Sequence, residues 1–137
     1  MRVLALILML ALAAPALAQN KPGGGPDPIP VSPGVSRDRV LPELAYTLGE
    51  LHYLAFACEG NHSQGWRTRM TELLDLEAPA AGYWRERMID QFNNGFRDQQ
   101  RYAMRCGAEA EAERRELASR GQRLSDALLA PLVAEAE

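Results

Sequence analysis

The stretch that decides the fold runs from residue 41 to residue 58 and reads LPELAYTLGELHYLAFAC. Its apolar side chains recur at spacings of three and four residues: Leu44, Leu48, Leu51, Ala55 and Cys58. This is the repeat of an α-helix with one apolar stripe. Pro42 suits the first turn of such a helix, where its missing N–H removes no hydrogen bond. The stretch therefore predicts an amphipathic helix over 41–58.

The rest of the chain has the same helical character. After residue 40 the β-branched apolar residues are reduced to Ile89 and Val133, which argues against a sheet. Apolar residues at helical spacing, separated by glycine and proline, predict three further helices over 64–77, 80–106 and 108–130. Pro131 is expected to end the last of them. Short connections between four amphipathic helices predict an all-α, up-down-up-down four-helix bundle.

One glycine lies in the middle of the helix predicted over 80–106. Gly95 follows Asn93 and Asn94, and glycine inside a helix costs about 1 kcal/mol relative to alanine. We expect Gly95 to let a neighbouring helix come close. The alternative is a kink at this point.

The two cysteines of the chain are Cys58 and Cys106. In the predicted bundle the helices over 41–58 and 80–106 run in the same direction, so their C-terminal ends lie together. Both cysteines fall at those ends, and the pattern predicts a Cys58–Cys106 disulfide. The alternative is a pair of free thiols for metal or redox chemistry, for which the usual C-x-x-C arrangement is missing.

The N-terminal residues have the form of a secretory signal peptide. Arg2 precedes an apolar run over 3–12, and Ala16-Leu17-Ala18 provides a small-residue cleavage site. The apolar run is shorter than the roughly 20 residues that span a membrane. We therefore expect cleavage near Ala18, a soluble protein in the periplasm, and no stable membrane insertion after cleavage.

Composition divides the remaining chain into three parts. Residues 19–38 are rich in proline and glycine and predict a flexible leader. The helical domain is expected over 39–132, followed by a C-terminal tail over 133–137. Loss of Arg2 with residues 1–18 would change the net charge from −3 to −4. That mild acidity argues against nucleic-acid binding.

Several short motifs follow one another in a set order. They are LGELHYL at 48–54 with Cys58, WRTRM at 66–70, FNNGF at 92–96 and Cys106. The set resembles an uncharacterised family of small secreted two-cysteine helical proteins from alphaproteobacteria, and the resemblance covers about 44–128. It implies a periplasmic helical domain and brings no activity. Proline often follows the second cysteine in that family, whereas Gly107-Ala108 stands here.

Two groups of side chains are candidates for binding. Arg97, Arg101 and Arg105 recur every four residues and would form one row along a helix. Such a row would bind an anionic component of the envelope or an acidic partner protein. The alternative is pairing with the glutamate-rich start of the helix over 108–130. Tyr53 and Tyr83 would mark an interaction surface, since tyrosine is enriched at interfaces.

Signals for catalysis and metal binding are weak. No serine lies in a G-x-S-x-G elbow, and the acidic residues, Glu50 among them, do not single out a catalytic pair. His52 and His62 are weak metal candidates, because they lack the spacing that brings two histidines to one helix face. No catalytic residue and no cofactor are predicted. The sequence favours a non-enzymatic interaction or accessory protein of the envelope; the alternatives are a small-ligand or anion-binding protein, an envelope-glycan hydrolase and, less strongly, a metal-binding protein.

Overall fold

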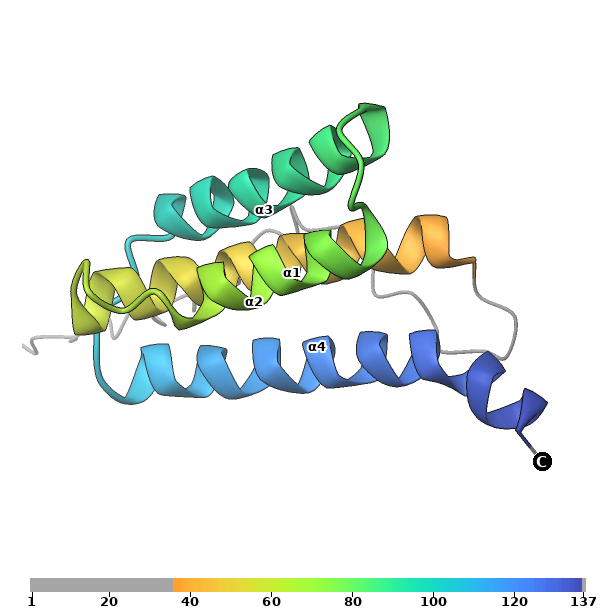
Figure 1. Cartoon of the computed structure of the whole chain (residues 1–137). Coiled ribbons are helices and arrows are strands. Elements are labelled where there is room, and N and C mark those ends of the chain that lie inside the picture. The colour runs from red at the N-terminus through yellow and green to blue at the C-terminus, as the bar shows by residue number, and fades with distance from the viewer. Residues whose placement is uncertain (1–35, 137) are drawn as a thin grey trace, which may run out of the picture.

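The computed structural model describes residues 36–136, so the predicted signal peptide and nearly all of the predicted leader lie outside the described residues. The described part consists of four α-helices and contains no strand. Figure 1 shows these helices, which are α1 (Arg37–Glu59), α2 (Gly65–Glu77), α3 (Tyr83–Arg101) and α4 (Ala108–Glu135). None of the described helices is both long enough and apolar enough to cross a membrane. The all-helical class with four helices is confirmed.

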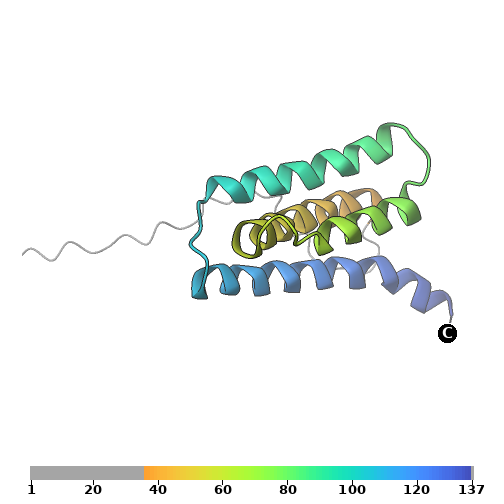
Figure 2. The ribbon, with the colours of Figure 1, turned by 60° about the vertical axis from the view of Figure 1, so that its left-hand side comes forward.

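Helix α1 lies at the centre of the fold. Figures 1 and 2 show α3 on one side of it, α4 on the opposite side and α2 alongside. Each of the other helices packs against α1, whereas within the described residues α4 makes no close backbone approach to α2 or α3. In Figure 1, α1 and α3 run in one direction and α2 and α4 in the other. The helices are thus grouped around a central helix rather than placed at the corners of a square.

Burial of α1 extends to all of its faces. Every residue from position 40 to position 52 is buried, including the polar residues Glu43, Thr47 and Glu50. The apolar stripe predicted for 41–58 is buried, but it is only part of the surface that this helix buries. Three neighbouring helices cover it, and a helix covered on all sides buries polar as well as apolar residues.

Helices α1 and α3 touch backbone to backbone where two glycines meet. A Cβ placed on Gly95 of α3 would lie 2.0 Å from the carbonyl oxygen of Tyr46 in α1. A Cβ placed on Gly49 of α1 would lie 2.0 Å from the carbonyl oxygen of Phe92 in α3. Neither position accepts a larger side chain unless a helix moves. The close approach predicted at Gly95 is confirmed, and α3 continues through this point as one helix.

Helix α3 ends earlier than the helix predicted over 80–106. Its last residue is Arg101, and Ala103 then takes a positive φ of 43°. This left-handed conformation does not continue a right-handed helix. Arg105 and Cys106 therefore lie in the turn that leads to α4.

Two prolines lie further inside their helices than predicted. Helix α1 starts at Arg37, so Pro42 stands in its second turn, and α4 continues through Pro131 to Glu135. Proline removes one backbone hydrogen bond and crowds the preceding turn, which can bend a helix without ending it. Figure 1 shows α4 bending near its C-terminal end. The predicted tail over 133–137 is therefore helical as far as Glu135.

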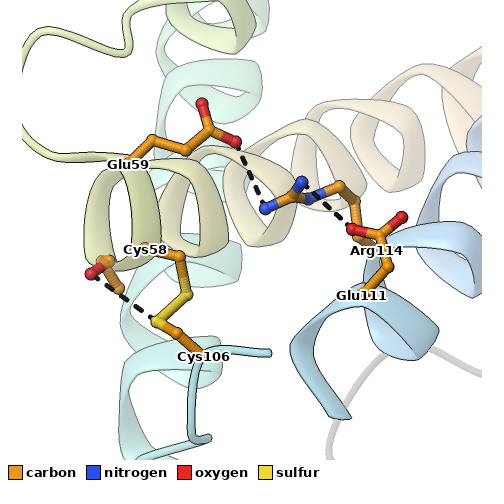
Figure 3. The surroundings of a disulfide bond; sticks show 6 residues. Cys58, Glu59, Cys106, Glu111 and Arg114 are labelled. Carbon is orange, nitrogen blue, oxygen red and sulfur yellow. Dashed lines mark hydrogen bonds and ion pairs between the residues drawn. A yellow bond between two sulfur atoms is a disulfide. The ribbon is translucent and has the colours of Figure 1, made fainter. Parts of the chain in front are cut away.

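Cys58 and Cys106 form the predicted disulfide, with their Cα atoms 5.5 Å apart. Figure 3 shows the bond between the last turn of α1 and the turn that precedes α4. Beside it, Arg114 of α4 forms ion pairs with Glu59 and with Glu111, both at 3.2 Å. The C-terminal end of α1 is thus joined to the start of α4 by a covalent bond and by an ion pair.

Replacing Gly95 by alanine should destabilise the protein, because the added methyl group would meet a backbone carbonyl that cannot turn away. Overpacking of this kind costs about 1–3 kcal/mol, and occasionally more. We expect G95A to lower the free energy of unfolding, measured in urea, by at least about 2 kcal/mol.

The matched control for G95A is G121A on α4. A Cβ at Gly121 would meet only a methyl group of Thr47, 3.8 Å away. Alanine favours a helix by about 1 kcal/mol over glycine, so G121A should leave stability unchanged or raise it. Equal losses in the two variants would contradict the glycine contact between α1 and α3.

Removing the disulfide should cost much of the stability of this small domain. The two cysteines are 48 positions apart, and closing a loop of that length contributes about 4 kcal/mol in the chain-entropy account. We expect the double variant C58A/C106A to lose about this amount in urea unfolding while keeping its helical circular dichroism. A loss below about 1 kcal/mol would contradict this role of the bond.

Candidate functional site

A groove with a volume of about 400 Å³ opens between α1, α2 and α3. Its apolar lining consists of Met70, Leu74, Ile89, Phe92 and Phe96. Four polar residues complete the lining: His52, Arg67, Thr71 and Asn93. Small-molecule sites in proteins are typically concave and apolar, with a few well-placed polar groups. This groove is therefore the candidate functional site.

Each of the three helices supplies a different part of the groove. Helix α1 contributes His52, and α2 contributes Arg67 from its first turn. Helix α3 contributes Phe92 and Phe96, which stand on either side of Gly95 in the sequence. Because Gly95 touches the backbone of α1, the two phenylalanines are held close to His52.

His52 is the buried polar residue of the groove. Only 7% of its surface is exposed, and its ring centroid lies 5.6 Å from those of Phe92 and Phe96. Its Nδ1 atom is buried and has no hydrogen-bond partner among the described residues. Burial, together with the charge of Arg67, lowers the pKa of His52 below its ordinary value. The imidazole is therefore neutral at neutral pH.

Arg67 supplies the positive charge of the groove. The described lining contains no carboxylate, and Arg67 forms no ion pair with any described residue. By contrast, Arg69 on the same helix pairs with Glu72 at 2.9 Å. The guanidinium of Arg67 is exposed and free to bind a carboxylate or another oxygen anion through two parallel hydrogen bonds.

A second groove, of about 390 Å³, lies between α1, α2 and α4. Three leucines of α1 line it: Leu44, Leu48 and Leu51. Among its described lining residues the one charged side chain is Arg69, which is already paired with Glu72. This second groove offers apolar contact without an unpaired charge.

The arginine row predicted on α3 is interrupted. Arg97 donates a hydrogen bond to Oδ1 of Asn94 at 2.6 Å, and Arg101 pairs with Asp98 at 3.0 Å. Arg105 lies beyond the end of α3, so the prediction of a three-residue row on one helix is wrong. None of the three arginines lines either groove.

The two tyrosines proposed as an interaction surface lie far apart. Tyr53 packs edge-on against Phe96, with ring centroids 5.3 Å apart. Tyr83 is the first residue of α3 and is 76% exposed. Since Phe96 stands 13 residues after Tyr83, about 20 Å of helix separates the two places. They do not form one patch.

The two weak metal candidates have different surroundings. His52 lies buried in the groove, whereas His62 is exposed in the turn after Gly60. Among the described residues, no three His, Cys, Asp or Glu side chains gather closely enough to hold a metal ion.

A buried ion pair that the sequence analysis did not predict lies outside the groove. Glu50 of α1 is 2% exposed and pairs with Arg120 of α4. Arg120 also donates a hydrogen bond from Nε to the hydroxyl of Thr47, 3.1 Å away. Burial lowers the pKa of Arg120, opposed by the nearby carboxylate of Glu43, and arginine stays charged in proteins. The pair holds α4 against α1.

Residues of the groove coincide with the motifs noted in the sequence. His52 belongs to LGELHYL, Arg67 to WRTRM, and Asn93 to FNNGF. The family described as "Protein of unknown function (DUF2385)" matches residues 37–131, which is more than half of the chain. The chain belongs to the DUF2385 family. No curated protein and no solved structure matches the chain. The DUF2385 match agrees with the resemblance to an uncharacterised family and carries no activity with it.

His52 is a candidate from the sequence, but the sequence does not indicate which residues meet it. Arg67, Thr71 and Asn93 are not among the site residues predicted from the sequence, although Arg67 and Asn93 stand inside the motifs WRTRM and FNNGF. These motifs are thus the feature of the sequence that could have identified Arg67 and Asn93 as site residues. Their spacing in sequence did not indicate that they converge in one groove.

The lowered pKa of His52 predicts a loss of stability at mildly acidic pH. The unfolded chain binds a proton at this histidine at a higher pH than the folded protein does. The free energy of unfolding should therefore fall as the pH drops below about 6.5, by up to about 1.4 kcal/mol per pH unit, until the folded pKa is passed. We expect H52F to remove this component between about pH 7 and pH 5, measured by urea unfolding.

The control for H52F is H62Q, which changes the exposed histidine. It should keep the acid-induced loss of stability. If H62Q removed the loss and H52F did not, the assignment to His52 would be wrong.

Proposed function

We propose that this protein is a non-enzymatic binding protein of the bacterial cell envelope, located in the periplasm, that takes a small ligand into the groove between α1, α2 and α3. In this accessory role it holds or presents the ligand and forms no covalent bond with it. A protein of the envelope, or an anionic envelope component, would deliver or receive the ligand.

The observation that carries this proposal is the composition of the groove. An apolar hollow of about 400 Å³ is combined with an unpaired guanidinium, Arg67, and a buried neutral imidazole, His52. Of these features, the exposed guanidinium of Arg67 makes no ion pair with any described residue, so it contributes no such contact to the fold. An exposed apolar patch edged by polar groups is typical of a binding site.

The carboxylates of the structure favour binding over hydrolysis of a glycan. Glycoside hydrolysis uses two carboxylates placed about 5–10 Å apart on either side of the scissile bond. The described lining of the groove contains none, and the buried carboxylate of Glu50 is engaged by Arg120 outside the groove. Ligand binding is therefore the better account of this groove.

The periplasmic location rests on the chain itself. Residues 1–18 have the form of a signal peptide, with Arg2 before an apolar run and an A-x-A site at Ala16-Leu17-Ala18. The Cys58–Cys106 disulfide is compatible with an oxidising compartment, where such bonds persist.

Binding of the neutral fluorophore N-phenyl-1-naphthylamine tests the proposed function. The probe becomes fluorescent in apolar surroundings, and we expect saturable binding to the purified protein with one site per chain. Ile89 lines the groove and is 39% exposed, so I89W should place an indole in the groove and abolish binding.

Two tryptophan variants serve as controls for I89W. L76W changes a residue that is 79% exposed and lines neither groove, and it should keep probe binding. A118W fills the second groove and should also keep it. The proposal is overturned if the wild-type protein binds no probe, or if A118W rather than I89W removes binding.

A further inference from the structure

We infer that the ligand of this groove is a small organic anion with an apolar body, whose charged group lies between Arg67 and His52 and whose body lies against the side chains of α3. This inference rests on the proposed function and names the ligand class of the same groove.

The charge of the described groove lining is positive only. Its described lining has one cation and no carboxylate, and no described residue neutralises Arg67. The neighbours of Arg67 in the lining are largely apolar, and a charge pair beside apolar groups is screened less than one in open water. An anion that enters the groove therefore meets a cation that has no other partner in the part of the chain that the structure describes.

His52 adds a hydrogen-bond donor to this cation. Its Nδ1 is buried with no partner among the described residues, and a buried N–H without a partner is rarer and less favourable than an unmet acceptor. The proton of the neutral ring therefore belongs on Nε2. Nε2–H is then the donor that His52 brings to the lining, and an oxygen anion is its natural acceptor.

The apolar residues of the groove indicate the chemical character of the uncharged part of the ligand. The side chain of Ile89 is 39% exposed. Met70, Leu74 and Phe92 are buried, with exposed fractions of 4%, 7% and 8%. An apolar ligand body covering Ile89 removes apolar surface from water, which favours binding. An inorganic anion such as phosphate cannot use this surface. The groove therefore matches an anion attached to an apolar body.

The second groove lacks this combination. Its arginine, Arg69, lies next to Glu72 in an ion pair at 2.9 Å, so an anion there would have to compete with a carboxylate of the protein. The two arginines belong to one helix and differ by two positions, which makes them a matched pair for mutagenesis.

Two fluorophores with the same body test the inference. 8-Anilino-1-naphthalenesulfonate carries a sulfonate on the anilinonaphthalene body of N-phenyl-1-naphthylamine, which is neutral. We expect R67Q to weaken binding of the anionic probe about tenfold and binding of the neutral probe less than about twofold, because only the anionic probe uses the guanidinium. Added salt should weaken binding of the anionic probe to the wild-type protein.

Three further variants test the charge of Arg67, the choice between Arg67 and Arg69, and the N–H group of His52. R67K keeps the charge but loses the two parallel hydrogen bonds, so its affinity for the anionic probe should lie between those of the wild type and R67Q. R69Q should change neither affinity. H52F keeps an aromatic ring without an N–H and should weaken binding of the anionic probe alone.

The possible failures are distinguishable. If R67Q leaves the anionic probe unaffected, or weakens both probes equally, the inference is overturned while groove binding of the neutral probe stands. If R69Q lowers the affinity for the anionic probe and R67Q does not, the anion binds in the second groove and the inference is likewise overturned. If the neutral probe does not bind the wild-type protein, the proposed function itself falls.

Discussion

The backbone contact between Gly49 and Gly95 is the constraint on which the rest of the structure depends. Without side chains at the crossing, α3 approaches α1 until the two backbones touch, and one whole side of α1 is covered. The same contact brings Phe92 and Phe96, on either side of Gly95, against His52. A backbone contact cannot relax by a change of rotamer, so this wall of the groove would already be formed when the proposed ligand binds. Preorganisation of this kind reduces the entropy lost on binding.

The other two neighbours of α1 are held by different forces. Helix α4 is joined to it by the buried pair of Glu50 and Arg120, and loss of either partner would leave a buried charge without compensation. Helix α2 is held by the apolar side chains of Met70 and Leu74, which are its buried residues, and by an ion pair between its Glu77 and Arg37 of α1. Within residues 36–136 it has neither a glycine contact with the backbone of α1 like that of α3 nor a buried ion pair like that of α4. The helix that carries Arg67 is thus the side of the groove that would adjust most readily to the proposed ligand.

The features predicted correctly from the sequence depend on local patterns or on residues with few possible roles. Apolar spacing indicated four helices, and Gly95 indicated a close helix contact. The spacing within α1 revealed one covered face but did not indicate how many helices cover the others. The groove was not predicted because Arg67 and Asn93 converge only once the positions of α2 and α3 are known. Helix ends were misplaced where packing overrode Pro131, and where Ala103 breaks α3 without a glycine or proline to mark the turn.

The Cys58–Cys106 bond makes a covalent ring of residues 58–106. Helices α2 and α3 lie entirely within this ring, and so do eight of the nine residues that line the groove, all except His52. A single proteolytic cut in the turn at 60–64 or at 78–82 therefore opens the ring without releasing a fragment. After such a cut, each of the helices α2 and α3 stays joined to α1, either through the peptide chain or through the disulfide. Both helices therefore keep a high effective concentration relative to α1. Nicked chains of this protein keep every component of the groove in one covalent molecule.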